Sequence, residues 1–335
     1  MLMKKSIIAL AVAGALTAPI AAQADATLYG SLRLNLSNYD STGLDFTDNA
    51  SRIGIKGSTE LFSGAKAIFQ WEQFVSTETG ALGYQKTQGN GGRLASIGIT
   101  GDFGTVNAGR QWSPFAIWTV FPTDILVNSD NSGNTGYQPG LHRLSNTVAY
   151  ISPAMNGLQV AAVLIANNND KAATSSAAIA TQADVDAGNA ATVGQVFNKT
   201  TTASDDSEDL DAYNLAVKYS VDGLTLAAST IGLEPSGQSV NSVAASYTTG
   251  GLYVAARYQD DETAGAGNED SYELAAKYTM DKTTVAANFI DNDNVADDAY
   301  SLEVSQKLGK AATAFVGYYD KGADDSLAVG YRVDF

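Results

Sequence analysis

The chain has 335 residues, no cysteine and a formal net charge of −16. The lack of cysteine excludes disulfide frameworks, thiolate metal sites and cysteine nucleophiles. The acidic balance argues against nucleic-acid binding, because neutralising phosphate groups requires clustered Lys and Arg. A length of this size fits one large domain or two ordinary ones, and no composition-shifted linker divides the chain.

The first 24 residues have the pattern of an export signal. Lys4 and Lys5 precede an apolar run over residues 7–18, and small residues precede and include Ala24. The run is shorter than the roughly 20 apolar residues that a membrane anchor needs. We therefore expect a secretory signal peptide over residues 1–24, cleaved after Ala24, and a single domain over residues 25–335.

Strict two-residue alternation follows the signal. Between Leu28 and Leu36, the even positions are apolar or Gly and the odd positions are Tyr or polar, which predicts a strand with two unlike faces. The same pattern returns at four other clear places, residues 213–219, 252–259, 272–278 and 327–335. No run of 18 apolar residues occurs after the signal, so no membrane helix is expected.

Three features favour a membrane β-barrel over a soluble sandwich. The alternating segments are about ten residues long, as tilted membrane strands are. Tyr and Phe lie near the ends of their apolar faces, where a membrane interface would place them. Charged residues occupy the middle of the opposite faces, which would cost several kcal/mol in a dry core but little beside water.

The connections alternate between short and long. We predict seven short turns, at residues 61–64, 102–103, 153–156, 221–223, 249–251, 280–282 and 309–310. Eight long loops are predicted at residues 37–49, 76–92, 113–142, 167–208, 232–237, 260–269, 292–297 and 320–324. These connections give sixteen antiparallel strands in a closed transmembrane barrel, with short periplasmic turns and long extracellular loops. Weaker alternation at 223–249 and after Thr284 and Ala311 leaves the count open by two.

In this order, six segments resemble the sixteen-stranded general porins of Gram-negative bacteria. The segments are Ala26–Gly30, Ser51–Gly57, Gly64–Glu72, Phe103–Gln111, Arg143–Pro153 and Gly330–Phe335. The resemblance implies a homotrimer in the outer membrane, with the third long loop folded into the barrel to form a constriction. It also implies that Phe335 is a recognition signal for the barrel-assembly machinery. The loop over residues 167–208 matches nothing in this family.

The polar strand faces supply candidate pore-lining residues. Alternation directs ten charged side chains toward the lumen: Arg33, Lys56, Lys66, Glu72, Lys218, Arg257, Glu273, Lys277, Glu303 and Arg332. The resemblance implies a constriction in which basic residues of the wall face acidic residues of the third loop; the matching positions are Arg33, Lys56, Arg110, Arg143, Asp124 and Asp130. Strict alternation would aim Arg110 at lipid, so a bulge or a position near the rim is required. The Pro-Glu-Phe-Gly motif of enteric porins is absent from this loop.

The third loop carries Trp112, Phe115, Trp118 and Phe121. These rings form either a track for sugars or a surface that packs the loop against the inner wall or a subunit interface. We favour packing.

Acidic residues gather in the predicted long loops. The clusters are Asp205, Asp206, Glu208 and Asp209; Asp260, Asp261 and Glu262; Asp291, Asp293, Asp297 and Asp298; and Asp324 and Asp325. The segment from Asp291 lacks the Gly and Glu of a calcium loop. We expect no cofactor and no dedicated metal site, but diffuse binding of divalent cations beside lipopolysaccharide.

The expected function is passive diffusion of ions and small hydrophilic solutes through an outer-membrane pore, with weak cation selectivity suggested by the net charge. A sugar-preferring porin remains an alternative. An outer-membrane hydrolase is less favoured, because His142 is the single histidine and no Gly-x-Ser-x-Gly motif accompanies it. We expect His142 to be a solvated loop residue. A solenoid adhesin would need a fixed repeat, which the sequence lacks.

Overall fold

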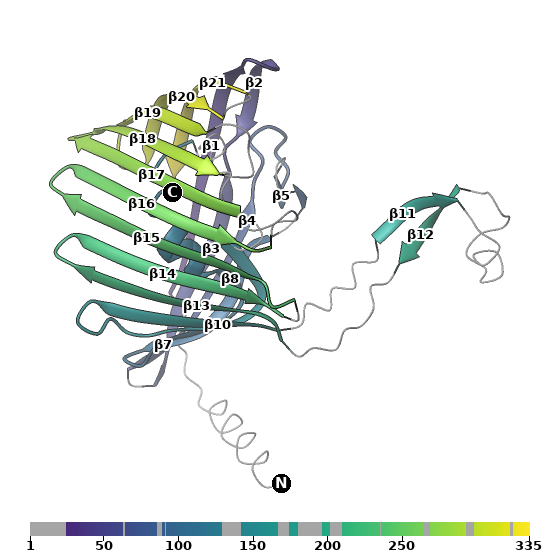
Figure 1. Cartoon of the computed structure of the whole chain (residues 1–335), viewed down its shortest axis with the longest axis vertical. Coiled ribbons are helices and arrows are strands. Elements are labelled where there is room, and N and C mark those ends of the chain that lie inside the picture. Colours follow the sequence, from purple (N-terminus) through teal and green to yellow (C-terminus); the bar gives the residue numbers. More distant parts are fainter. Residues whose placement is uncertain are drawn as a thin grey trace, which may run out of the picture.

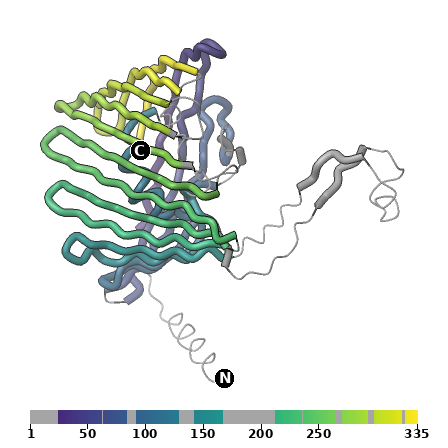
Figure 2. The backbone as a smooth tube through the Cα atoms, viewed as in Figure 1, coloured from purple at the N-terminus to yellow at the C-terminus, as the bar shows by residue number. Residues whose placement is uncertain are grey.

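The computed structural model describes residues 25–62, 64–85, 89–90, 92–128, 142–166, 174–179, 196–201, 210–234, 236–263, 269–292, 298–321 and 324–335. Long antiparallel strands wrap around a central lumen (Figure 1). The backbone trace in Figure 2 shows their short connections at one end of the barrel. The predicted signal peptide, residues 1–24, lies outside the described residues.

The wall is one antiparallel sheet. Its strands are β1 (Asp25–Tyr39), β2 (Gly43–Asp48), β3 (Arg52–Phe62), β4 (Ala65–Phe74), β7 (Gly92–Gly101), β8 (Gly104–Trp112), β9 (Arg143–Ile151), β10 (Leu158–Ala166), β13 (Leu210–Val221), β14 (Leu224–Leu233), β15 (Ser239–Thr249), β16 (Leu252–Asp261), β17 (Glu269–Met280), β18 (Thr283–Asn292), β19 (Ala299–Lys307), β20 (Ala312–Asp320) and β21 (Ser326–Asp334). Two hairpins stand apart from this sheet: β5 (Tyr84–Gln85) with β6 (Gly89–Asn90), and β11 (Thr174–Ile179) with β12 (Val196–Thr201).

Strands β2 and β3 together form one strand of the wall. Both pair with β1, β2 along Leu34–Tyr39 and β3 along Asp25–Ser31, and the short break between them contains Ala50 at a φ of 57°. Counted in this way, the barrel has the predicted sixteen strands. The prediction of a loop over residues 37–49 was wrong, because strand pairing continues to Tyr39 and resumes at Gly43.

The first and last strands close the barrel. Strand β1 pairs with β21 from Ser31 opposite Asp334 to Tyr39 opposite Ser326. The backbone of terminal Phe335 adds two hydrogen bonds to Gly30, of 2.9 and 3.1 Å. Closure leaves the sheet without a free edge, which satisfies the backbone hydrogen bonds that hydrocarbon cannot provide.

The short turns follow from residues that tolerate positive φ. Asn156 and Gly157 have φ values of 51° and 89°, and Asp222 and Gly223 have values of 46° and 85°. Two consecutive positive values define the type I′ turn, whose twist matches that of the flanking strands and for which Asn-Gly and Asp-Gly are favoured. The local sequence therefore fixes these two hairpins.

The two faces of the sheet have opposite chemistry. On β17, the side chain of Leu274 is 55% exposed on the outside, whereas neighbouring Glu273 is 2% exposed on the inside. The same contrast recurs around the wall, where the exposed large apolar side chains and the buried polar ones alternate along the strands. This arrangement confirms the sidedness that the alternation predicts.

The third loop folds into the lumen, as the resemblance implies. Its short π-helix η1 (Ala116–Val120) contacts β14 and β15. Phe115 and Val120 pack against Ile231 and Val240 on the inner wall. Within the described part of the chain, no helix is long and apolar enough to cross a membrane.

The cysteine-free sequence allows a direct test of sidedness. We expect a water-soluble maleimide to label Lys277→Cys in vesicle-inserted protein and to lower its conductance, because this position faces the lumen. Leu274→Cys, three residues earlier on the outer face, should react only with a lipid-soluble maleimide. Labelling measured by mass spectrometry with the opposite preference would contradict the assigned faces.

Candidate functional site

The narrow part of the lumen lies between the third loop and the barrel wall. The loop leaves β8 at Trp112 and first follows the wall near β14 and β15 through η1. It then continues along the inner wall, where Leu126 packs against Ala286, Tyr319 and Ala328 on β18, β20 and β21. The loop is therefore attached to the inner wall at successive strands, from β14 to β1.

An ion pair and a hydroxyl group fasten the middle of the loop. Arg257 Nη1 lies 2.6 Å from Glu273 Oε1, and both side chains are almost fully buried. Glu273 also accepts a hydrogen bond from the hydroxyl group of Thr123 on the loop. The ion pair joins β16 to β17, and the hydroxyl group of Thr123 attaches the loop to this pair through Glu273.

Glu303 fastens the far part of the loop. Its carboxylate accepts hydrogen bonds from the backbone N–H groups of Val127 and Asn128, at 2.9 and 3.0 Å, and from the hydroxyl group of Tyr319, at 2.9 Å. The side-chain amide of Asn35 on β1 donates to Asn128 Oδ1 at 2.8 Å. Glu303 is thus a structural carboxylate that accepts hydrogen bonds from both the loop and the wall residue Tyr319.

A basic cluster lies on β1, β3 and β21. Arg33 and Arg332 are directly opposite each other in the sheet, and Arg332 Nε contacts both carboxylate oxygens of Asp334 at 2.8 and 2.9 Å. Arg52 begins β3 and pairs with Ser31 of the same wall region. Several arginines are thus close together on one part of the wall. Their combined charge creates a positive potential in the lumen.

Asp124 of the third loop lies within electrostatic range of Arg33 and Arg52 in this cluster. Part of its side chain is accessible to water, but protein atoms surround the carboxyl group closely and desolvate it. This desolvation, together with the charge of Glu273, raises the pKa of the Asp124 carboxyl group to about 6. The nearby charges of Arg33 and Arg52 oppose the rise.

Three luminal lysines lie over aromatic rings. Lys56 Nζ is 5.1 Å from the ring centroid of Tyr29, and Lys277 Nζ is 4.9 Å from that of Tyr253. Lys218 Nζ lies 5.0 Å from the centroid of loop residue Trp118. Within the described residues, none of these lysines forms an ion pair. Their charges therefore act on the water-filled lumen.

The two ends of the third loop meet in a stack of arginine and aromatic side chains. Arg93 lies over Phe74 and Trp112, at 4.7 and 5.7 Å from their ring centroids. Arg143 lies over the same two rings, at 5.6 and 4.8 Å. Arg93 also contacts buried Glu72. The stack joins β4, β7, β8 and β9 at the base of the loop.

His142 extends this stack, and its predicted solvation was wrong. The imidazole is only 6% exposed and lies 6.4 Å from the Trp112 ring and 6.2 Å from the Phe121 ring. Desolvation lowers the pKa of His142 to about 2, with a further contribution from Arg257 and Arg143. Residues distant in sequence cover this histidine, so the loop pattern could not reveal its burial.

Several predicted site residues lie elsewhere. Lys66 forms an exposed ion pair of 3.1 Å with Glu60 beside a short turn. Arg110 is near the end of β8, at a register irregularity between Gly109 and Gln111. It pairs with Ala95 on the outer face of β7 and donates to backbone oxygens of β7 and β9. Asp130 lies outside the described residues.

The loop aromatics pack against the wall. Phe115 and Trp118 are 1% and 5% exposed, and Trp118 covers Ala161, Ala216 and Ala227. Their faces are therefore unavailable to a passing sugar. This confirms the packing interpretation for these two rings.

Sequence reasoning missed four residues that the structure brings to the site. Arg52 was within a family segment but was not singled out, and Arg93 precedes the regular alternation of β7 at another irregularity, between Glu72 and Gln73. Asn35 and Asn128 fasten the loop. The polar face of β1 carried a signal for Asn35, whereas nothing in the sequence marked Asn128.

No group of three or more His, Cys, Asp or Glu side chains suited to a metal ion occurs among the described residues. Acidic residues of the loops form hydrogen bonds with other parts of the protein. Asp324, for example, accepts hydrogen bonds from the backbone N–H and the hydroxyl group of Ser41, at 3.0 and 2.8 Å.

Known proteins resemble both the sequence and the fold. The chain is 36% identical over 143 residues to the major outer membrane protein P.IB of Neisseria gonorrhoeae, covering 39% of this chain and 37% of that protein. It is 34% identical over 181 residues to the P.IB protein of Neisseria meningitidis, covering 50% and 51%. The matched segments thus span about two fifths to half of these curated relatives.

Solved porin structures share the fold over nearly the whole chain. An OmpF complex with daunomycin from Salmonella typhi has a TM-score of 0.68 at 18% identity, covering 92% of this chain and 97% of that one. An anion-selective porin from Comamonas acidovorans has a TM-score of 0.66 at 17% identity, covering 93% and 100%. The family model for Gram-negative porins matches residues 9–326, and the chain therefore belongs to this family.

Proposed function

We propose that the protein forms a water-filled channel through the Gram-negative outer membrane for passive diffusion of ions and small hydrophilic solutes. The observation that carries this proposal is the reversal of chemistry across the wall, with charged side chains around the lumen and apolar ones outside. The third loop narrows the lumen, so size and charge select the solute there. Stepwise conductance of the purified chain in planar bilayers tests the proposal directly.

We propose an anion preference, in place of the cation preference that net charge alone suggests. Four luminal carboxylates are occupied: Glu72 by Arg93, Glu273 by Arg257, Glu303 by the third loop and Asp334 by Arg332. Lys56, Lys218 and Lys277 add positive charge without an ion-pair partner among the described residues. Local charge at the narrow point governs an ion more strongly than distant loop charge does, because salt screens over about 8 Å.

Family membership and the burial of side chains in the third loop argue against an enzyme and against a sugar-binding track. The family points to a channel. A histidine held neutral by a pKa of about 2 is a poor general base near pH 7, and His142 is also covered by aromatic rings. Burial of Phe115 and Trp118 removes two of the four rings from a possible sugar track.

The assembly and its surroundings are part of the proposal. Family membership supports a homotrimer, with terminal Phe335 recognised by the barrel-assembly machinery. The acidic loop residues suit diffuse binding of divalent cations next to lipopolysaccharide, with no cofactor involved. Native mass spectrometry and gel mobility of unheated protein measure the subunit number.

Reversing one free luminal charge should change selectivity. A single charge at about 10 Å in water changes the energy of an ion by about 0.4 kcal/mol, and Lys277→Glu changes the charge by two units, so this variant should lower the anion-to-cation permeability ratio several-fold. Lys282→Glu, on the adjacent exposed turn, makes the same charge change outside the lumen and is the control. Reversal potentials in a salt gradient measure both. Equal shifts in the two variants would contradict the luminal assignment.

Protonation of Asp124 should make the channel more anion-selective. Its carboxyl group is charged above a pKa of about 6 and neutral below it, so lowering the pH from 7 to 5 removes a negative charge from the lumen. Asp124→Asn should flatten this pH dependence, whereas Asp222→Asn on a short turn should preserve it. A pH response that survives in Asp124→Asn would assign the titration to another group.

Arg143 should act through stacking as well as charge. Arg143→Lys keeps the charge but loses the planar guanidinium that lies over Phe74 and Trp112, an interaction worth about 0.5–2 kcal/mol. We expect noisier open-channel current, from a less restrained third loop, with little change in reversal potential. Arg332→Lys lies outside the stack and serves as the control for losing a guanidinium group.

A further inference from the structure

A groove lies on the outer wall of the barrel. It has a volume of about 630 Å³ and crosses β10, β13, β14 and β15. The strands that border it form the lower front of the barrel in Figure 1. Since its exposed lining residues belong to the outward register of these strands, the groove opens away from the lumen.

Strand register explains how the groove forms. One outward row runs across the strands through Tyr150, Ala162, Leu215, Thr230 and Asn241. The next row runs through Val160, Val217, Ala228 and Val243. The small side chains of both rows leave a depression between larger, well-exposed neighbours such as Leu215 and Val243, which are 49% and 50% exposed. The depression follows the rows and is continuous with the apolar belt.

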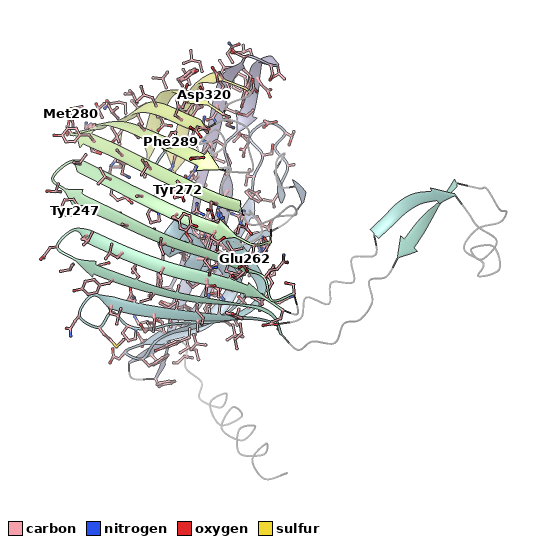
Figure 3. The ribbon with its side chains drawn as sticks, viewed as in Figure 1. Tyr247, Glu262, Tyr272, Met280, Phe289 and Asp320 are labelled. Atoms are coloured by element: carbon pink, nitrogen blue, oxygen red, sulfur yellow. The ribbon has the colours of Figure 1, made fainter. Side chains whose placement is uncertain are left out.

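The row from Tyr150 to Asn241 runs obliquely from the short-turn end of the barrel toward the long-loop end. Tyr150 is one residue from the short-turn end of β9, whereas Asn241 is two residues from the long-loop end of β15. Figure 3 shows the two ends, with Met280 at the short turns and Glu262 at the long loops. A flexible chain lying in the groove would therefore cross much of the membrane, with one end toward the long loops.

Polar side chains occur at the long-loop end of the groove. Asn241 Nδ2 donates to Ser239 Oγ at 2.9 Å, and Ser239 Oγ donates to Glu262 Oε2 at 3.0 Å. Asn241 pairs with Thr230 across the strands, so an amide and a hydroxyl group lie side by side on a face made for hydrocarbon. Such groups are costly there without partners. Each amide has two N–H donors, and Ser239 uses one of those of Asn241.

We propose that this groove binds one acyl chain of a lipid in the extracellular leaflet, with its ester or amide carbonyl near Asn241 and Thr230. The apolar depression takes the hydrocarbon, and the polar end takes the carbonyl group. Single rows of side chains bound the groove, so it is narrow enough for one acyl chain. A protein partner would instead need a flat patch of roughly 800 Å². The proposal rests on the membrane location of the outer face and not on solute conduction.

Filling the groove should displace the lipid. The protein is inserted into phospholipid vesicles that contain a phosphatidylethanolamine with a photoreactive diazirine in its acyl chain, and labelled residues are mapped by mass spectrometry. We expect labelling of the wild-type chain to concentrate within residues 210–249, and Ala228→Leu to lower it at least threefold. Asn241→Leu, which keeps the depression but removes its polar end, should lower it less.

Ala276→Leu is the matched control, because Ala276 lies on the outer face of β17 away from the groove. It should leave the labelling of residues 210–249 unchanged. The proposal would be overturned if the wild-type chain were labelled around the whole apolar belt in proportion to exposure. Unchanged labelling of residues 210–249 in Ala228→Leu, or cross-links from the groove to a second copy of the chain, would also overturn it. The wild-type map decides even where a variant folds poorly. Conductance should persist in all variants, which separates this test from that of the channel.

Discussion

Pairing of every backbone N–H and C=O group within the sheet is the constraint on which this architecture depends. Hydrocarbon offers no partner to an open strand edge, so β1 pairs with β21, and Phe335 forms backbone hydrogen bonds with Gly30 of β1. Closure in turn gives the sheet an inside and an outside. Because side chains alternate along each strand, a single sequence register then decides which residues meet lipid and which meet the lumen.

The inside is only partly filled, and the third loop determines how. Its apolar residues cover small side chains on β10, β13 and β14, while its backbone and hydroxyl groups bind Glu273 and Glu303 farther along the same wall. Two carboxylates that strand register directs toward the lumen thus hold the third loop through hydrogen bonds. The lysines over Tyr29, Trp118 and Tyr253, together with Arg33 and Arg52, place positive charge around the lumen. Because these carboxylates are bound to the loop while basic side chains line the lumen, a protein with a negative net charge can have a basic lumen.

The outer wall is also more than a uniform apolar surface. Side chains of different size in adjacent rows create a groove, and Asn241 and Thr230 place hydrogen-bonding groups at its long-loop end. A sheet with regular pairing positions such rows rigidly, since neighbouring strands keep a fixed register. The same regularity that closes the barrel therefore shapes the surface that faces the membrane.

The sequence by itself determined the strands, their faces and their turns, because these depend on local two-residue alternation and on residues such as Asn156–Gly157 and Asp222–Gly223 that favour one turn geometry. It also placed Arg257, Lys277 and Glu303 toward the lumen by register. Only the tertiary structure decided their partners. Glu273 meets Arg257 across a strand pair and Thr123 from 150 positions away, and His142 is buried by Trp112 and Phe121, contacts that no local pattern encodes. Charge pairing and burial arise from contacts between residues distant in sequence, so net charge alone does not show which charges in the lumen are paired.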